Sequence, residues 1–338
     1  MKCIKMLQKN KKGRIISMLK PITGTWFEFY HHNKPEGKYW NPVCRHFSEE
    51  QWETKVDEIA SLGMKYIVLM CSSLVYDDYA ETYFDNDIYP FADMPAKDPI
   101  GALMRAAERN GIKVFVSAGF YGIWTHTVEN MTSEDVKKRA FKAMERLVEL
   151  YGDSRAFGGW YLPDETCIAP RFSEDFIKYV NEYAAFGRRI KKGAQILIAP
   201  YGTNILKADD AYVKQLERLD ADIVAYQDEI GVRKSKPEQT GAYYEALRKA
   251  HDKAGRSALW ADMECFEFEG DVYRSALVPA EMSRIERQIE SISPYVDEIL
   301  IYQYQGLFNK PGTTAFCGHP DSVKLYNDYV EFLNRIKK

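Results

Sequence analysis

A repeated alternation of two sequence patterns constrains the fold of this chain more than any other feature. Short runs rich in β-branched and aromatic residues, typical of buried strands, recur eight times after residue 20. These runs are ITGTWFEFY (22–30), KYIVLMCSS (65–73), IKVFVSAGF (112–120), FGGWYLPDE (157–165), AQILIAPY (194–201), ADIVAYQDEI (221–230), SALWADMECF (257–266) and EILIYQYQG (298–306). A charged segment with apolar residues at helical spacing follows each run, which predicts eight strand–helix units.

The predicted helices carry recognisable start and stop signals. They cover residues 48–63, 98–111, 133–152, 173–193, 209–219, 237–255, 279–294 and 321–338. Ser48 and Gln51 form a capping-box pattern, and glycines stand where helix C-caps belong, at positions 63, 111, 193 and 255. Strict alternation with near-continuous apolar strands indicates parallel strands covered by helices. Eight units favour an α/β fold consisting of a single closed (β/α)8 TIM barrel.

The chain divides at about residue 20. We expect a basic N-terminal tail over residues 1–20 and one catalytic barrel domain over residues 21–338. The apolar patch around Ile15 and Leu19 is too short for a signal-peptide core, and no stretch is long enough to span a membrane. As written, the sequence predicts a cytoplasmic protein. An export signal on the natural precursor would instead place it in the periplasm or at the cell surface.

Charge and composition limit the partners. The 46 Lys and Arg residues nearly balance 49 Asp and Glu, so no global field attracts nucleic acid or an anionic membrane. No G-x-G-x-x-G follows the first strand run and no G-x-x-x-x-G-K-[ST] occurs, which disfavours a nucleotide site. The 23 tyrosines offer apolar faces with polar edges, which suits a sugar. The sequence does not indicate an oligomeric state.

Acids, amides and tyrosines dominate the carboxyl ends of the predicted strands. Chemistry in (β/α)8 enzymes takes place at these ends. The polar residues there are Glu28, Tyr30, His31, Ser72, Ser73, Tyr121, Asp164, Glu165, Tyr201, Gln227, Asp228, Glu229, Asp262, Glu264, Gln303 and Gln305. Crowded carboxylates in a partly desolvated cleft shift one another's pKa values apart, so that one stays protonated while a neighbour is ionised. Hydrolysis of a glycosidic bond needs that division of labour.

Two of these strand ends carry a family resemblance. The segments WYLPDE, ending at Glu165, and LWADME, ending at Glu264, resemble clan A glycoside hydrolases, the retaining TIM-barrel enzymes. Residues 21–338 more closely resemble a bacterial family of unknown function described as TIM-barrel glycosyl hydrolases. The resemblance implies that Glu165 is the general acid/base and Glu264 the nucleophile. This chain differs from clan A members at two places. It has Asp164 where they have Asn, and the stretch 302–305 stands where they have a Trp on the eighth strand.

Other assignments of the acids remain open at this stage. Glu165 could be an ordinary polar strand terminus ended by Pro163. Alternation puts Asp262 and Glu264 on the same side of their strand, so Asp262 takes the nucleophile role if Glu264 lies beyond the barrel. Asp228 and Glu229 are candidates for the partner of Glu165 or for orienting a substrate hydroxyl.

The remaining polar and aromatic candidates are assigned to substrate binding. Trp124 and Tyr121 are the preferred stacking residues. The adjacent side chains of His31 and His32 diverge in an extended segment, so no metal and no cofactor are expected, and His31 is taken as a hydrogen-bonding residue. The predicted substrate-binding residues are Glu28, His31, Tyr121, Trp124, Asp164, Tyr201, Gln227, Asp228, Glu229, Asp262, Gln303 and Tyr304.

Three functional hypotheses follow from these residues. The first is a retaining glycoside hydrolase acting on a carbohydrate through Glu165 and Glu264. The second is a carbohydrate-binding barrel without catalysis, suggested by Asp164 in place of Asn. The third is a metal-dependent barrel hydrolase that uses His31 with Asp228 or Asp262.

Overall fold

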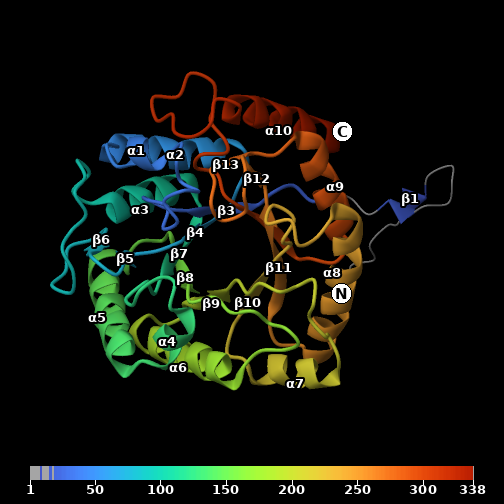
Figure 1. Ribbon diagram of the computed structural model, residues 1–338, viewed down its shortest axis with the longest axis horizontal. Coiled ribbons are helices and arrows are strands. Elements are labelled where there is room, and N and C mark those ends of the chain that lie inside the picture. Colours follow the sequence, from blue (N-terminus) through green and yellow to red (C-terminus); the bar gives the residue numbers. More distant parts are fainter. Residues whose placement is uncertain (1–7, 10–14, 17–18, 338) are drawn as a thin grey trace.

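Eight parallel strands close into one barrel, as the alternating sequence predicts (Figure 1). The computed structural model describes residues 8–9, 15–16 and 19–337. The pairing of Leu300 with Gly24 closes the ring. Its strands are β3 (Gly24–Phe27), β4 (Tyr66–Leu69), β7 (Lys113–Ser117), β8 (Phe157–Leu162), β9 (Gln195–Ile198), β10 (Ile223–Gln227), β11 (Ala258–Glu264) and β14 (Glu298–Tyr302).

A helix follows every barrel strand, and Figure 1 shows these helices surrounding the ring. The capping box is confirmed, because Ser48 and Gln51 each accept a hydrogen bond from the other's backbone N–H. Gly111 and Gly255 are left-handed C-caps, with φ of 69° and 62°. The helices are α2 (Glu49–Ser61), α3 (Pro99–Asn110), α5 (Glu134–Tyr151), α6 (Glu174–Ile190), α7 (Asp210–Arg218), α8 (Pro237–Ala254), α9 (Met282–Ile292) and α10 (Ser322–Ile336).

Short extra elements follow four of the barrel strands at their carboxyl ends. Helix α1 (Asn41–Cys44) lies in the long segment after β3. The antiparallel hairpin of β5 (Ser73–Val75) and β6 (Ala80–Thr82) lies after β4. Helix α4 (Thr127–Thr132) follows β7, and the hairpin of β12 (Phe266–Phe268) and β13 (Leu277–Pro279) follows β11. Insertions at this end surround the mouth where the predicted site residues gather.

The predicted tail over residues 1–20 lies mostly outside the described residues. Within it, β1 (Gln8–Lys9) pairs antiparallel with β2 (Ile15–Ile16). The assignment of residues 21–338 to one catalytic domain stays a prediction. Among the described helices, none is long and apolar enough to cross a membrane.

Aromatic side chains fill the barrel interior below the polar mouth. Trp260 of β11 contacts Tyr66 of β4 and Phe115 of β7, with ring centroids 4.7 and 6.0 Å away. Because β11 is a neighbour of neither β4 nor β7 in the ring, the three aromatic rings meet inside the barrel. Strand alternation then turns Asp262 and Glu264 inward above Trp260. This packing provides the floor of the candidate site.

The first prediction concerns the packing of helix α2 on the barrel. Trp52 is fully buried against Phe27, Phe29 and Phe47, with ring centroids 5.8, 5.0 and 5.0 Å away. We expect Trp52→Ala to lower the free energy of unfolding by about 3–5 kcal/mol, because it removes this contact and leaves a cavity. Urea unfolding followed by circular dichroism measures the loss.

The control for this prediction is Val128→Ala. Val128 is 63% exposed, so its truncation should leave the urea midpoint within error of the wild type. An equal effect of the two substitutions would contradict the packing role assigned to Trp52.

Candidate active site

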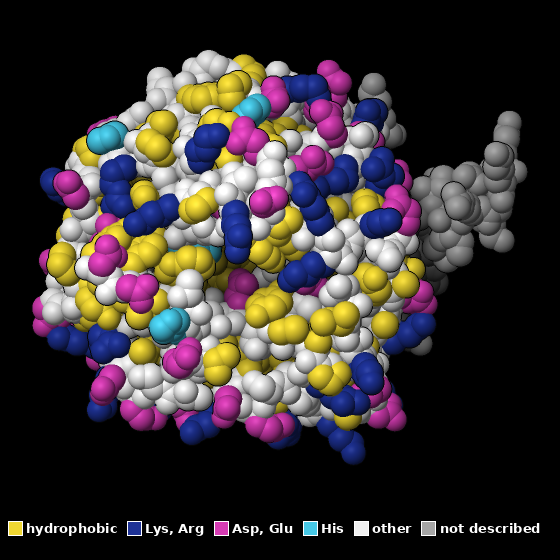
Figure 2. Space-filling model, viewed as in Figure 1, with side chains coloured by type: hydrophobic (Ala, Val, Ile, Leu, Met, Phe, Trp, Pro, Cys, Tyr) yellow, Lys and Arg dark blue, Asp and Glu magenta, His cyan; other side chains and the backbone are white. Residues whose placement is uncertain are grey.

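A cavity of about 130 Å³ opens at the carboxyl ends of the barrel strands. Figure 2 shows a hollow near the centre of one face, with an acidic side chain recessed in it. Four carboxylic acids contribute to the lining, and none of the described Lys or Arg residues does. The lining residues are His32, Glu36, Met70, Glu165, Gln227, Asp262, Glu264, Phe266 and Tyr302. The structure thus brings together four predicted site residues: Glu165, Gln227, Asp262 and Glu264.

Glu165 is held by two hydrogen-bond donors. Strand β8 ends at Leu162, and Pro163 follows it. The Tyr161 hydroxyl donates to Oε1 of Glu165 at 2.8 Å, and Nε2 of Gln227 donates to Oε2 at 2.7 Å. Burial raises the pKa of Glu165 to about 7 although both donors favour the ionised form. Glu165 can therefore exchange a proton at neutral pH.

Asp262 and Glu264 reach the same cavity from β11 but have different surroundings. The backbone N–H of Val232 donates to Oε2 of Glu264 at 2.9 Å. Burial is the largest cause that raises the pKa of Glu264, and the nearby charge of Asp228 is the second. Together they raise it to about 8. In the described part of the chain, Oδ1 of Asp262 has no hydrogen-bond partner. Burial and the charges of Glu165 and Glu264 raise the pKa of Asp262 well above its usual range.

Asp228 does not line the cavity and instead forms hydrogen bonds to residues around it. Its Oδ1 accepts hydrogen bonds from the backbone N–H of Glu264 at 3.1 Å and of Ile230 at 3.3 Å. Its Oδ2 accepts from Nε2 of Gln288 at 2.7 Å. Asp228 therefore fixes the backbone at Glu264. Its neighbour Glu229 has φ of 54° and pairs with Lys234 at 3.3 Å, outside the residues that line the cavity.

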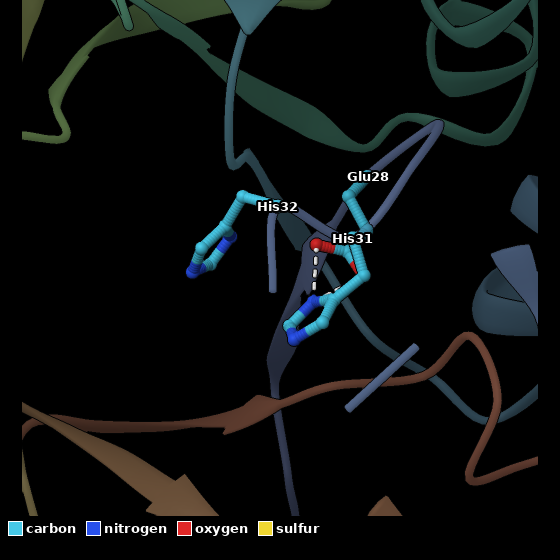
Figure 3. A group of neighbouring side chains, drawn as sticks. All are labelled: Glu28, His31 and His32. Carbon is cyan, nitrogen blue, oxygen red and sulfur yellow. Dashed lines mark hydrogen bonds and ion pairs between the residues drawn. The ribbon is translucent and has the colours of Figure 1, made fainter. Parts of the chain in front are cut away.

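His31 lies between two carboxylates next to the cavity. Its Nδ1 donates to Oε1 of Glu28 at 2.8 Å, drawn as a dashed line in Figure 3, and its Nε2 donates to Oε2 of Glu36 at 3.0 Å. Glu28 also accepts from Trp40 at 3.0 Å and Gln303 at 2.6 Å. Burial alone would lower the pKa of His31, but the charges and hydrogen bonds of Glu28 and Glu36 raise it to about 10.

The group of Glu28, His31 and His32 has the residue types of a metal site, with ligand atoms within 4.8 Å of one another. A metal ion needs a lone pair from each imidazole. The pKa of His31 is raised by Glu28 and Glu36, and a doubly protonated imidazole that donates to both carboxylates has no lone pair for an ion. Figure 3 shows His32 to one side, with no bond to either neighbour. The donor set therefore fits a buried ion pair and does not fit a metal ion.

Two predicted aromatic residues lie at the rim of the site. The ring of Trp124 packs on His32, with centroids 4.6 Å apart. Nζ of Lys234 lies 5.2 Å from the ring centroid of Tyr201. Neither aromatic ring lines the cavity itself. They can contact only a ligand that extends beyond it.

Other predicted binding residues face away from the cavity. Asp164 accepts a hydrogen bond from Asn130 of α4 at 3.0 Å and one from Tyr179 of α6 at 3.5 Å. Tyr121 is buried and bonds to Ser72 at 3.0 Å. Tyr304 is buried beneath α2, where it donates to Glu58 at 2.8 Å. These three residues, like Gln303 on Glu28, support the walls.

Five lining residues were not among the sequence predictions: His32, Glu36, Met70, Phe266 and Tyr302. Glu36 lies in the 31–47 segment, whose length is a signal of function. Glu36 is the one acid of that segment, and its return to the cavity depends on the turn that presents it to His31. Met70 and Tyr302 follow strand alternation, and an aromatic at the end of β14 was the available signal for Tyr302.

The second prediction concerns the charge of His31. Its folded pKa lies above the unfolded value, so the stability it contributes is fully present below about pH 6.5 and is lost as pH rises through about 10. We expect imidazole ¹⁵N NMR to show His31 doubly protonated at pH 8. Glu28→Gln should lower its pKa, because the substitution removes the larger stabilising charge.

The matched control for Glu28→Gln is Glu269→Gln. Glu269 is an exposed carboxylate paired with Lys38 and should not affect His31. Ordinary titration of His31 near pH 6.5 in the wild type would contradict the proposed ion pair.

Comparison with solved structures places this fold among known TIM barrels. A "putative alpha-L-fucosidase" from Bacteroides thetaiotaomicron aligns with a TM-score of 0.71 at 17% identity, over 94% of this chain and 96% of that one. The endo-beta-1,4-mannanase from Thermotoga petrophila aligns with a TM-score of 0.58 at 12% identity, over 94% and 77%. A glycoside hydrolase family 5 protein from Bacteroides vulgatus aligns with a TM-score of 0.55 at 14% identity, over 97% and 68%.

Sequence comparison assigns the family. A search of curated proteins gives no significant match. The family described as "Domain of unknown function (DUF4434)" matches residues 22–315, which span the strands and most of the helices of the barrel. The chain therefore belongs to the DUF4434 family.

Proposed function

We propose that this protein is a retaining glycoside hydrolase in which Glu165 is the general acid/base and Glu264 the nucleophile. One observation carries the proposal: the two glutamates line the same small cavity, from the ends of β8 and β11. Similarity to a mannanase and a family 5 glycoside hydrolase supports the choice of reaction through the shared fold. The proposed substrate is a carbohydrate.

In the first step, protonated Glu165 donates its proton to the glycosidic oxygen while the carboxylate of Glu264 attacks the anomeric carbon. The bond between that carbon and the leaving oxygen breaks, the aglycone departs as an alcohol, and a glycosyl ester forms on Glu264. In the second step Glu165 takes a proton from water, whose oxygen attacks the anomeric carbon. The sugar leaves, and Glu264 regains its carboxylate.

The surroundings of each acid support these roles. Glu264 must be ionised to attack; with a pKa of about 8 its anion is the minor form at pH 7, and the Val232 N–H stabilises that charge, whereas among the described residues Oδ1 of Asp262 has no such donor. Ionisation of Glu264 is therefore favoured over that of Asp262. Glu165 must alternate between acid and base, and its pKa of about 7 suits both directions. Gln227 and Tyr161 would hold its carboxyl group in place.

The third prediction tests both glutamates through the covalent intermediate. Glu165→Gln should hydrolyse ordinary glycosides about 10²–10⁴-fold more slowly, because it removes general acid catalysis. A 2,4-dinitrophenyl glycoside needs no acid to leave, so this variant should accumulate a glycosyl-enzyme that mass spectrometry detects. Peptide mapping should place the sugar on Glu264, and Glu264→Gln should form no adduct.

A panel of 2,4-dinitrophenyl glycosides of common hexoses, pentoses and fucose supplies the substrate. A sugar attached to Asp262 would overturn the assignment of Glu264. Binding of sugars without turnover of any glycoside in the panel would favour the carbohydrate-binding barrel instead.

The fourth prediction concerns the pH profile. The reaction needs Glu165 protonated and Glu264 ionised, and the pKa values are about 7 and about 8, so kcat/KM should be highest between about pH 7 and 8 and fall on either side. Tyr161→Phe removes a hydrogen bond that favours the ionised form of Glu165, so it should raise the pKa of Glu165 and move the limb near pH 7 to higher pH. Tyr151→Phe removes a hydroxyl that bonds to Asp98 at the start of α3 and should leave the limb unmoved. A limb that stays in place in Tyr161→Phe would contradict the role of Glu165.

A further inference from the structure

The cavity holds more acid than the proposed reaction uses. Hydrolysis with retention requires two carboxyl groups, here Glu165 and Glu264. Glu36 and Asp262 also line the cavity, and the lining contains no Lys or Arg. Its one imidazole, His32, is neutral, because burial and the charge of His31 lower its pKa to about 3. Two acids therefore remain without a role in the chemistry.

Asp262 is the more informative of these two acids. It is 3% exposed, and its Oδ1 has no hydrogen-bond partner among the described residues. Alternation along β11 turns this side chain inward, into the cavity that it lines. A buried carboxyl oxygen without a donor is costly, since the desolvation is not compensated. A ligand that brings a donor to Asp262 would remove this cost.

Glu36 adds negative charge to the cavity. It accepts from His31 at 3.0 Å and from the Asn33 amide at 2.6 Å. The single positive charge of His31 is shared between Glu28 and Glu36. Glu28, His31 and Glu36 together therefore carry a net charge of about −1 beside the cavity.

Two cationic side chains that follow the strands bearing the site residues are directed elsewhere. Arg284 donates to the backbone carbonyls of Glu264 and Phe266, at 2.8 Å each. Lys234 pairs with Glu229. Neither Arg284 nor Lys234 lines the cavity. A positive charge inside it would have to come from the ligand.

We propose that the cavity binds an amino sugar, whose primary ammonium group donates to Asp262 in the negative field of Glu36. This inference rests on the proposed function, because it names the class of sugar at the same site. An ammonium group offers three donors and a full charge, whereas a hydroxyl offers one donor and no charge. Hydrogen bonds to charged groups are roughly twice as strong as those between neutral groups.

The test compares each amino sugar with its own hydroxyl parent. Calorimetric titration at pH 7 uses the methyl glycosides of glucosamine, galactosamine and mannosamine against those of glucose, galactose and mannose. At least one amino sugar should bind about 10-fold or more tightly than its parent. Its N-acetylated form, which has lost the charge, should not show this preference.

Two variants test the assigned acids. Asp262→Asn keeps the shape of the side chain and should reduce the amino-sugar preference to within about 2-fold. Glu36→Gln should also reduce it, and this variant tests the charge independently if Asp262→Asn does not fold. Asp271→Asn removes the same charge from an exposed loop and should keep the full preference.

The outcomes separate this inference from the proposed function. Equal binding of every amino sugar and its parent, or a preference unchanged in both Asp262→Asn and Glu36→Gln, overturns the inference. Hydrolysis of neutral glycosides that depends on Glu165 would leave the proposed function standing in that case. Preferential binding of an amino sugar without cleavage of any glycoside would instead support the inference and overturn the proposed function.

Discussion

Closure of the parallel barrel is the constraint on which the site depends. The carboxyl ends of parallel strands all lie at the same end of the barrel. Residues far apart in sequence therefore meet there once the sheet closes. Glu165 and Glu264 are separated by nearly a hundred positions, yet they line one cavity. Aromatic rings such as Trp260 fill the interior below and exclude water from the base of the cavity. The carboxyl groups are therefore crowded in a partly desolvated space.

Desolvation then determines how the acids divide their roles. Burial destabilises the ionised forms of Glu165, Asp262 and Glu264. The hydrogen-bond donors that reach each carboxylate determine how large this destabilisation is. Glu165 has two side-chain donors and Glu264 has one backbone donor. Glu28 is the contrasting case, because His31 supplies a full positive charge and holds the pKa of Glu28 below its usual value despite burial. The same residue type is thus an ion-pair partner with a lowered pKa at β3 and an acid with a raised pKa after β8.

The sequence predicts the parts of this structure that repeat. Strand and helix periodicity, the Ser48 capping box and the glycine caps were sufficient for the barrel, because each is a local signal. Alternation also placed Asp262 and Glu264 on one face of β11. It failed to orient Asp164, because β8 ends at Leu162 and the chain beyond Pro163 no longer alternates. Glu36 could not be identified, since its place depends on contacts between a loop and His31 that leave no periodic pattern.

A comparison of two neighbouring aspartates shows why the orphan acid bears on ligand recognition. Asp228 and Asp262 lie at or just beyond the ends of β10 and β11, and both are almost completely buried. Two backbone N–H groups and Gln288 satisfy Asp228, which is what a structural acid requires. Among the described residues no donor reaches Oδ1 of Asp262, although three hydrogen bonds reach Asp228 only one strand away. Since the fold supplies donors where an acid is structural, the missing donor at Asp262 indicates a partner that arrives with the ligand.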